Sequence, residues 1–181
     1  MRRVVVTGIG TINSTGHNVK DSFEAVVNGV CGIDAITLFD ASEFSVKIAG
    51  EVKDFDPTTV MDKKEVKKAD RFIQLGIKAA LEAMIDSGYV TQEDKKVDAS
   101  IADRFGMISG SGIGGLSTIE RNSIVCETKG SRKVSPFFIP SSLANMLSGF
   151  ISIEHNLRGP SLSHVTACAA STHALNDAVK T

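Results

Sequence analysis

The sequence predicts an α/β layered fold with a largely parallel sheet. Short β-branched runs alternate along the chain with segments whose apolar residues recur at helical spacing, and glycines separate many of them. The chain has 181 residues, 42% hydrophobic and 23% charged, which suits about one domain and excludes a disordered chain.

The first half of the chain supplies two strands and two helices. Arg3–Thr7 is a β-branched run that ends at a glycine, as a buried strand does. Val19–Asn28 carries an apolar helical stripe, and Val46–Val52 alternates like a strand near a sheet edge. Asp70–Ser87 is apolar over more than one stripe, so we expect a helix buried on two sides.

The second half continues the alternation with two strands, Phe105–Ser109 and Leu162–Ala167, and three helices, Leu116–Glu127, Ser141–Ile153 and Ser171–Val179. The last helix keeps its periodicity up to Thr181 without a stop signal, which indicates that the chain ends within it. Between Val134 and Asn176 the only full charges are Glu154 and Arg158. We therefore expect the C-terminal third to face an interior or interface and the middle third to face solvent.

Composition excludes several classes of protein. The 20 basic and 21 acidic side chains nearly cancel, so nothing indicates a nucleic-acid binder. Three widely spaced cysteines without a CxxC pair indicate free thiols in a reducing compartment and no metal site. The apolar run at the N-terminus is too short for a signal peptide. The uncharged stretch Val134–Ile153 contains prolines and polar groups, which are unsuited to a membrane span. These features predict a soluble, cytoplasmic protein.

Gly110–Gly115 formally satisfies the G-x-G-x-x-G pattern after a strand and before a helix. A dinucleotide site would also need a carboxylate about 20 residues later, and none occurs between Thr128 and Ile153. The alternative is a tight turn that brings the backbone close to a neighbour.

Cys168 lies where a predicted strand meets a predicted helix, among very small residues. This is the layout of a nucleophile elbow. The helix N-terminus favours the thiolate, and the cysteine's own N–H can help to stabilise an oxyanion. The alternative is a small buried hydrophobic residue. Cys31 and Cys126 have no such setting and are assigned to structure. His173, about 140° around the helix from Cys168, is a poor candidate for its base.

A basic cluster runs from Lys63 to Arg71, and a second basic pair, Arg132 and Lys133, precedes the uncharged stretch. Such a cluster is either a solvated helix face or a docking patch for an acidic partner.

Four segments occur in the order found in a known family: Val4–Gly10, Gly110–Gly115, Ser135–Ser141, and Gly159–Ser161 with Thr166–Cys168. Together they resemble a β-ketoacyl-acyl-carrier-protein synthase of type II, the elongating condensing enzyme of fatty-acid synthesis. All 181 residues align with a little under half of a typical member.

This resemblance implies a thiolase-like αβαβα sandwich in the complete protein, assembled as a homodimer without a cofactor. Residues 1–181 would be the N-terminal portion, with a mostly parallel, mixed sheet. Cys168 would accept the acyl chain from acyl carrier protein, and malonyl-carrier protein would then lose CO₂ and attack the thioester. Ile113 would gate the acyl pocket and Phe138 would line it. The residues implied in carrier-protein docking are Lys64, Lys67, Lys68, Arg132 and Lys133.

The family's two catalytic histidines, its active-site lysine and its second oxyanion donor belong to the C-terminal half, so we expect the 181 residues alone to be inactive. Three alternatives remain. They are a nucleotide-binding oxidoreductase half, a non-catalytic partner subunit of a condensing enzyme, and a binding module that folds alone. Cys168 argues against the second, and the apolar face of the uncharged stretch argues against the third.

Overall fold

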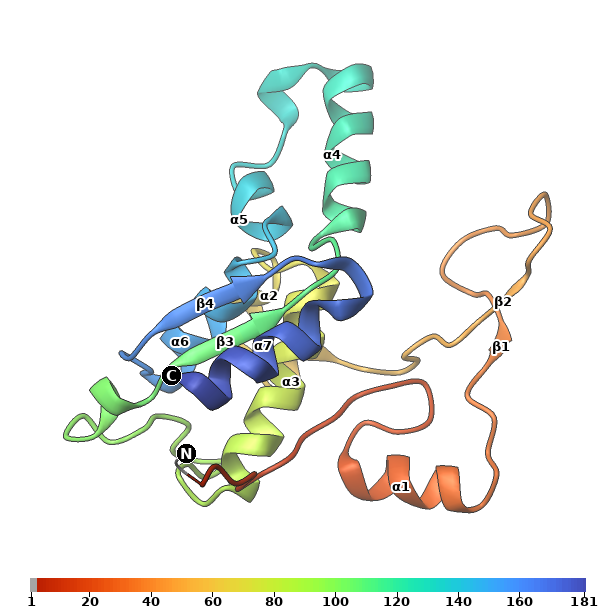
Figure 1. Cartoon of the computed structure of the whole chain (residues 1–181). Helices are drawn as coiled ribbons and strands as arrows, with labels where there is room; N and C mark the ends of the chain where they lie inside the picture. Colours follow the sequence, from red (N-terminus) through yellow and green to blue (C-terminus); the bar gives the residue numbers. More distant parts are fainter. Residues whose placement is uncertain (1–2) are drawn as a thin grey trace.

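The structure is a computed structural model and describes residues 3–181 (Figure 1). Its α-helices are α1 (Val19–Val27), α2 (Lys63–Val66), α3 (Arg71–Asp86), α4 (Leu116–Lys129), α5 (Phe138–Ser142), α6 (Met146–His155) and α7 (Ala170–Lys180). Its strands are β1 (Asp34–Ala35), β2 (Ile48–Ala49), β3 (Met107–Gly110) and β4 (Ser161–His164). Short 3₁₀ turns are η1 (Pro57–Thr59), η2 (Ala102–Arg104), η3 (Ser131–Lys133) and η4 (Ala167–Ala169).

Strands β3 and β4 form a parallel pair between two helices. Ser109 lies opposite Ser163 in the register, and Gly110 lies opposite His164. Ser148 on α6 hydrogen-bonds both serines, at 2.8 and 3.0 Å, so that face of the pair is turned toward α6. Successive side chains of a strand alternate between faces. Gly110 and His164 are therefore turned to the opposite face, which α7 covers, and an α/β/α stack results.

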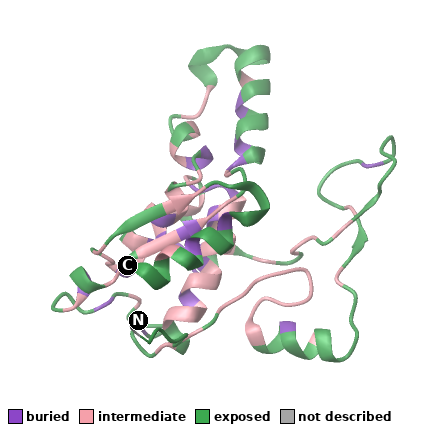
Figure 2. Cartoon of the chain, in the orientation of Figure 1, coloured by how far each residue is buried: buried purple, intermediate pink, exposed green. Residues whose placement is uncertain are grey.

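The hydrophobic core lies around α3, at the centre of the molecule (Figure 2). Asp70 caps α3 by accepting a hydrogen bond from Phe72 N. Ile73, Ile77 and Leu81 of α3 are almost fully buried. They join a cluster that also contains Val60, Met61, Ala69, Val90, Val97 and Ile151. The expectation that the middle third faces solvent is therefore wrong, because its apolar stripe forms most of this core.

Helix α1 and the β1–β2 hairpin extend away from this centre (Figure 1). β1 and β2 pair antiparallel over two residues, and large side chains of the hairpin loop are exposed, Leu38 by 81% and Phe44 by 57%. The expected strand Val46–Val52 is thus reduced to Ile48–Ala49. The described residues hold two separate two-stranded sheets, one parallel and one antiparallel, rather than one mixed sheet.

Two further sequence predictions are corrected. Arg3–Thr7 is not a strand, because it pairs with no other strand within residues 3–181. The segment that follows packs against α3 instead: a Cβ on Gly8 or Gly10 would collide with the α3 backbone. The expected helix Ser141–Ile153 is split into α5 and α6, with the Ser142 carbonyl accepting from Gly115 N rather than continuing the helix.

The other expected elements are present with small shifts of their ends. No helix within residues 3–181 is long and apolar enough to cross a membrane.

Candidate functional site

The turn between β4 and α7 presents Cys168. The cysteine is the middle residue of η4, which connects the end of β4 to the first residue of α7. The preceding residue, Ala167, has φ +49°, a left-handed conformation that costs free energy for a residue with a side chain. Cys168 itself is exposed. Within residues 3–181 Cys168 is therefore an exposed thiol on a strand-to-helix turn, and its role as a nucleophile stays a prediction.

Gly110, at the end of β3, allows α7 to begin where it does. A Cβ built on Gly110 would lie 2.5 Å from the carbonyl carbon and oxygen of Ala170 and 2.6 Å from Ser171 N. These atoms belong to the first turn of α7, and backbone atoms cannot rotate out of the way. The small residue at position 110 is thus a condition for the turn that carries Cys168.

The backbone around Cys168 is arranged for an anion. Within residues 3–181 its amide N–H has no acceptor, whereas Ala169 N and Ala170 N donate to Thr166 O and Ala167 O. The N-terminal end of α7, an 11-residue helix, follows directly. A helix N-terminus stabilises negative charge, so the turn can stabilise an oxyanion on an attached acyl group.

The histidines near this turn are engaged elsewhere. His173 Nδ1 lies 2.8 Å from Thr166 Oγ1. His164 Nε2 lies 3.0 Å from Asp177 Oδ2, but outside hydrogen-bond geometry, so the contact is electrostatic and depends on protonation of the ring. Within residues 3–181 neither ring forms a hydrogen bond with Cys168.

The glycine run Gly110–Gly115 is used for packing inside the protein. Gly114 has φ +97°, and a Cβ there would lie 2.5 Å from Ser142 O. At the start of α4, Gly115 N donates to Ser142 O and Thr118 N donates to Asp70 Oδ2 at 2.9 Å. Two amides at the start of α4 are thus already paired, whereas a dinucleotide pyrophosphate would need free amides at a helix N-terminus. The geometry therefore favours the tight-turn interpretation over a nucleotide site.

The two residues implied in acyl binding lie on neighbouring segments. Ile113 is 65% exposed and follows Gly112, whose Cβ position is 3.8 Å from Ala167 O. The loop with Ile113 thus passes beside the turn of Cys168. Phe138 is half-buried and begins α5.

One residue of each basic cluster lines a shared pocket. Lys64 lies on α2, Lys67 and Lys68 follow it, and Arg132 and Lys133 form most of η3. Lys67 and Lys133 line the same pocket. Lys68 differs from the others because its ammonium pairs with Glu65 at 2.6 Å and lies 5.6 Å from the Phe137 ring centroid.

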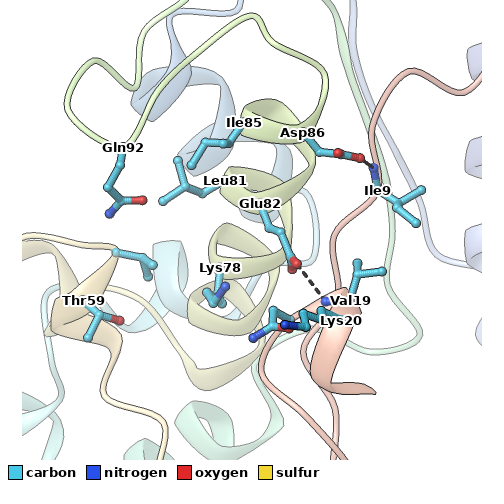
Figure 3. Close-up of a pocket in the computed structure, with 12 residues that line it drawn as sticks. Ile9, Val19, Lys20, Thr59, Lys78, Leu81, Glu82, Ile85, Asp86 and Gln92 are labelled. Atoms are coloured by element: carbon cyan, nitrogen blue, oxygen red, sulfur yellow. Dashed lines mark hydrogen bonds between the residues drawn. The ribbon is translucent and has the colours of Figure 1, made fainter. Parts of the chain in front are cut away.

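Sequence reasoning missed two groups of residues. Arg121 on α4 lines the same pocket as Lys67 and Lys133. Glu82 and Asp86 on α3 hold the N-terminal segment, since Glu82 accepts from Val19 N and Asp86 accepts from Ile9 N (Figure 3). Glu82 also accepts from Thr11 N. A pocket of about 630 Å³ lies beside these carboxylates and contains none of the predicted site residues. No periodicity or motif marks either group in the sequence.

A parallel strand pair lies between helices, and an exposed cysteine lies on the turn from strand to helix, so the chain is an α/β protein. Comparison with known proteins identifies the family of the chain. The model of one family, described as Beta-ketoacyl synthase, N-terminal domain, matches residues 1–181, and the chain belongs to this family.

Curated relatives agree. The chain is 44% identical over 179 residues to 3-oxoacyl-(acyl-carrier-protein) synthase 2 of Coxiella burnetii and 46% identical over 179 residues to that of Vibrio harveyi. Each alignment covers 99% of this chain and 42% of the relative. The chain thus spans less than half the length of these relatives and corresponds to their N-terminal part.

Solved structures show the same fold. A beta-ketoacyl synthase from Burkholderia phymatum superposes with a TM-score of 0.82 at 22% identity, over 99% of this chain and 43% of that chain. A ketosynthase of a type II PKS, solved with its acyl-carrier protein, gives a TM-score of 0.77 at 24% identity, over 99% of this chain and 46% of that one. The thiolase-like fold expected for the N-terminal part is confirmed.

Proposed function

We propose that the whole protein is a 3-oxoacyl-acyl-carrier-protein synthase of fatty-acid elongation. An acyl chain passes from acyl carrier protein to Cys168 Sγ: the thiolate attacks the thioester carbonyl, and the carrier's thiolate leaves. Malonyl-carrier protein then loses CO₂, and the resulting carbanion attacks the acyl-cysteine, which releases the Cys168 thiolate. The observation that supports this most strongly is the exposed Cys168 at the start of α7.

The turn suits the first half of this reaction. Formation of the acyl-cysteine passes through a tetrahedral intermediate with a negatively charged oxygen. The Cys168 N–H is free of other acceptors within residues 3–181, so it is available to that oxygen. In this proposal Ile113, on the adjacent loop, gates the acyl pocket, and Phe138 lines it. The groups that assist decarboxylation would come from the remainder of the whole protein.

The proposed partner is an acidic acyl carrier protein. The basic surface formed by α2 and η3 supports this, because Lys64, Lys67, Arg132 and Lys133 form no ion pair within residues 3–181. A relative of the same fold has been solved with an acyl-carrier protein. Long-range attraction between such surfaces raises the association rate and weakens with salt. A triple variant in which Lys64, Lys67 and Lys68 are each changed to Glu should bind the carrier protein more weakly at low salt. An unchanged dissociation constant would contradict the docking role.

The proposal also includes a homodimer and a cytoplasmic location. Three unpaired cysteines are compatible with a reducing compartment.

Acyl transfer to the cysteine tests the proposed function directly. The whole protein is incubated with acyl-carrier protein, digested, and analysed by mass spectrometry. We expect the acyl mass on the peptide that contains Cys168. A Cys126→Ser control should keep the adduct and Cys168→Ser should lose it. Acylation of a different cysteine, or none at all, would contradict the proposal.

A further inference from the structure

A pocket of about 330 Å³ lies between α2, α4 and the segment that joins η3 to α5. Three cations line it: Lys67 just after α2, Arg121 on α4, and Lys133 on η3. No acidic residue lines it, and none of the three cations forms an ion pair within residues 3–181. Uncompensated positive charge from three different elements is therefore concentrated in one concave site.

Buried polar contacts fix the walls of this pocket. Asn122, which is 7% exposed, donates to Thr118 O at 2.9 Å and accepts from Ser135 N at 3.0 Å, so it joins α4 to the segment after η3. Ser141, which is 5% exposed, donates to Lys68 O at 2.6 Å and joins α5 to the end of α2.

A third buried contact completes the frame. Asp70 Oδ2 accepts from Thr118 N at 2.9 Å and thereby connects the start of α3 to α4. Because satisfied buried polar groups of this kind hold a single arrangement, the backbone segments that carry the three exposed cations are fixed relative to one another.

The donors that remain free suit a tetrahedral oxyanion. The ammonium groups of Lys67 and Lys133 have no hydrogen-bond acceptor within residues 3–181, and the guanidinium of Arg121 makes only one long contact, 3.4 Å to Thr118 Oγ1. Ser135 Oγ accepts from Phe137 N, which leaves its O–H free to donate. An Arg fork combined with two ammonium groups and a hydroxyl matches the several acceptor oxygens of a phosphate.

We infer that Lys67, Arg121 and Lys133 form a phosphate-binding pocket, and that Arg121 is its central ligand. The phosphate is either a phosphate ester presented by the acyl carrier protein or free phosphate. The first source rests on the proposed function, since it requires that a carrier protein docks on this face. Binding of free phosphate in the pocket does not require that a carrier protein docks there.

The test of the pocket uses inorganic phosphate and the purified protein. Phosphate is titrated into wild type, Arg121→Gln and the control Lys129→Gln, which removes a positive charge from the same helix outside the pocket. Because loss of a charge-assisted hydrogen bond is costly, we expect Arg121→Gln to weaken phosphate binding about tenfold and Lys129→Gln to leave it nearly unchanged. Lys133→Gln should weaken it as well.

Arg121 is exposed, so its variant should unfold at the wild-type temperature. The inference is overturned if wild type shows no saturable binding of phosphate, or if Arg121→Gln binds phosphate as tightly as Lys129→Gln.

A second arm separates the two sources of phosphate. Binding of the carrier protein is measured before and after its phosphate-linked prosthetic group is attached. A gain in affinity that is present in wild type and lost in Arg121→Gln assigns the pocket to the carrier's phosphate ester. Equal affinity for the two carrier forms, with saturable binding of inorganic phosphate, assigns it to free phosphate. A carrier protein that does not bind at all would contradict the proposed docking while leaving the phosphate titration as the test of the pocket.

Discussion

Gly110→Ala should disturb the turn that carries Cys168. The added Cβ would lie 2.5 Å from the carbonyl carbon and oxygen of Ala170, well inside van der Waals contact, so α7 must shift away from β3. Such overpacking costs about 1–3 kcal/mol, and the rigid backbone on both sides favours the upper end. Replacing a glycine lowers the entropy of the unfolded chain and returns up to about 1 kcal/mol. The net destabilisation is therefore about 2 kcal/mol.

The assay combines thermal unfolding with the rate at which Cys168 reacts with a thiol reagent. For a chain of this size about 2 kcal/mol lowers the melting temperature by about 4–8 °C. Gly112→Ala is the matched control, because its Cβ would lie no closer than 3.8 Å to its neighbours. We expect Gly110→Ala to melt earlier and to label Cys168 at an altered rate, with the control unchanged. If both variants behave like wild type, the packing of Gly110 does not position the nucleophile turn.

Three further outcomes are expected. Ser148→Ala removes the hydroxyl that links α6 to both strands and should destabilise the protein by about 1–3 kcal/mol, measured by denaturant unfolding; an unchanged midpoint would show that these hydrogen bonds contribute little. Lys67→Gln should weaken carrier binding more than Lys68→Gln, since Lys68 already has an acidic partner; equal dissociation constants for the two variants would contradict this. The hydrogen bond from Lys53 holds the pKa of Asp34 below its ordinary value of 3.8. The contact between the two side chains therefore stabilises the hairpin at pH values above 3.8, and this stabilisation is lost as the pH falls through the lowered pKa of Asp34. In Lys53→Gln an NMR titration should move the Asp34 midpoint upward, and an unmoved midpoint would remove Lys53 as the cause.

Local sequence signals predicted the elements near the candidate site well. α3 and α4 were expected within two residues of their observed ends, and α7 within one. β4 was expected to run on to Ala167, but the strand ends at His164 and the turn follows. Periodicity, small residues and glycine stops are properties of neighbouring residues, so they can be read from a single sequence. The strand–turn–helix layout around Cys168 is one of the features that neighbouring residues reveal.

Features that depend on distant partners were not predictable in the same way. Arg3–Thr7 has the composition of a strand, but a strand needs a partner to pair with, and composition does not reveal one. The split between α5 and α6 accompanies a hydrogen bond from Gly115 to Ser142, two residues far apart in the sequence. Arg121 joins Lys67 and Lys133 only because buried polar contacts bring three elements together.

In the proposed function the turn before α7 makes Cys168 more reactive than the other two cysteines. All three cysteines are exposed within residues 3–181, so accessibility there does not by itself set Cys168 apart from Cys31 and Cys126. The most direct measurement is the rate of alkylation of each cysteine by iodoacetamide at neutral pH in the whole protein, followed peptide by peptide with mass spectrometry. We expect Cys168 to react about tenfold faster than Cys31 and Cys126. Equal rates at the three positions would contradict it.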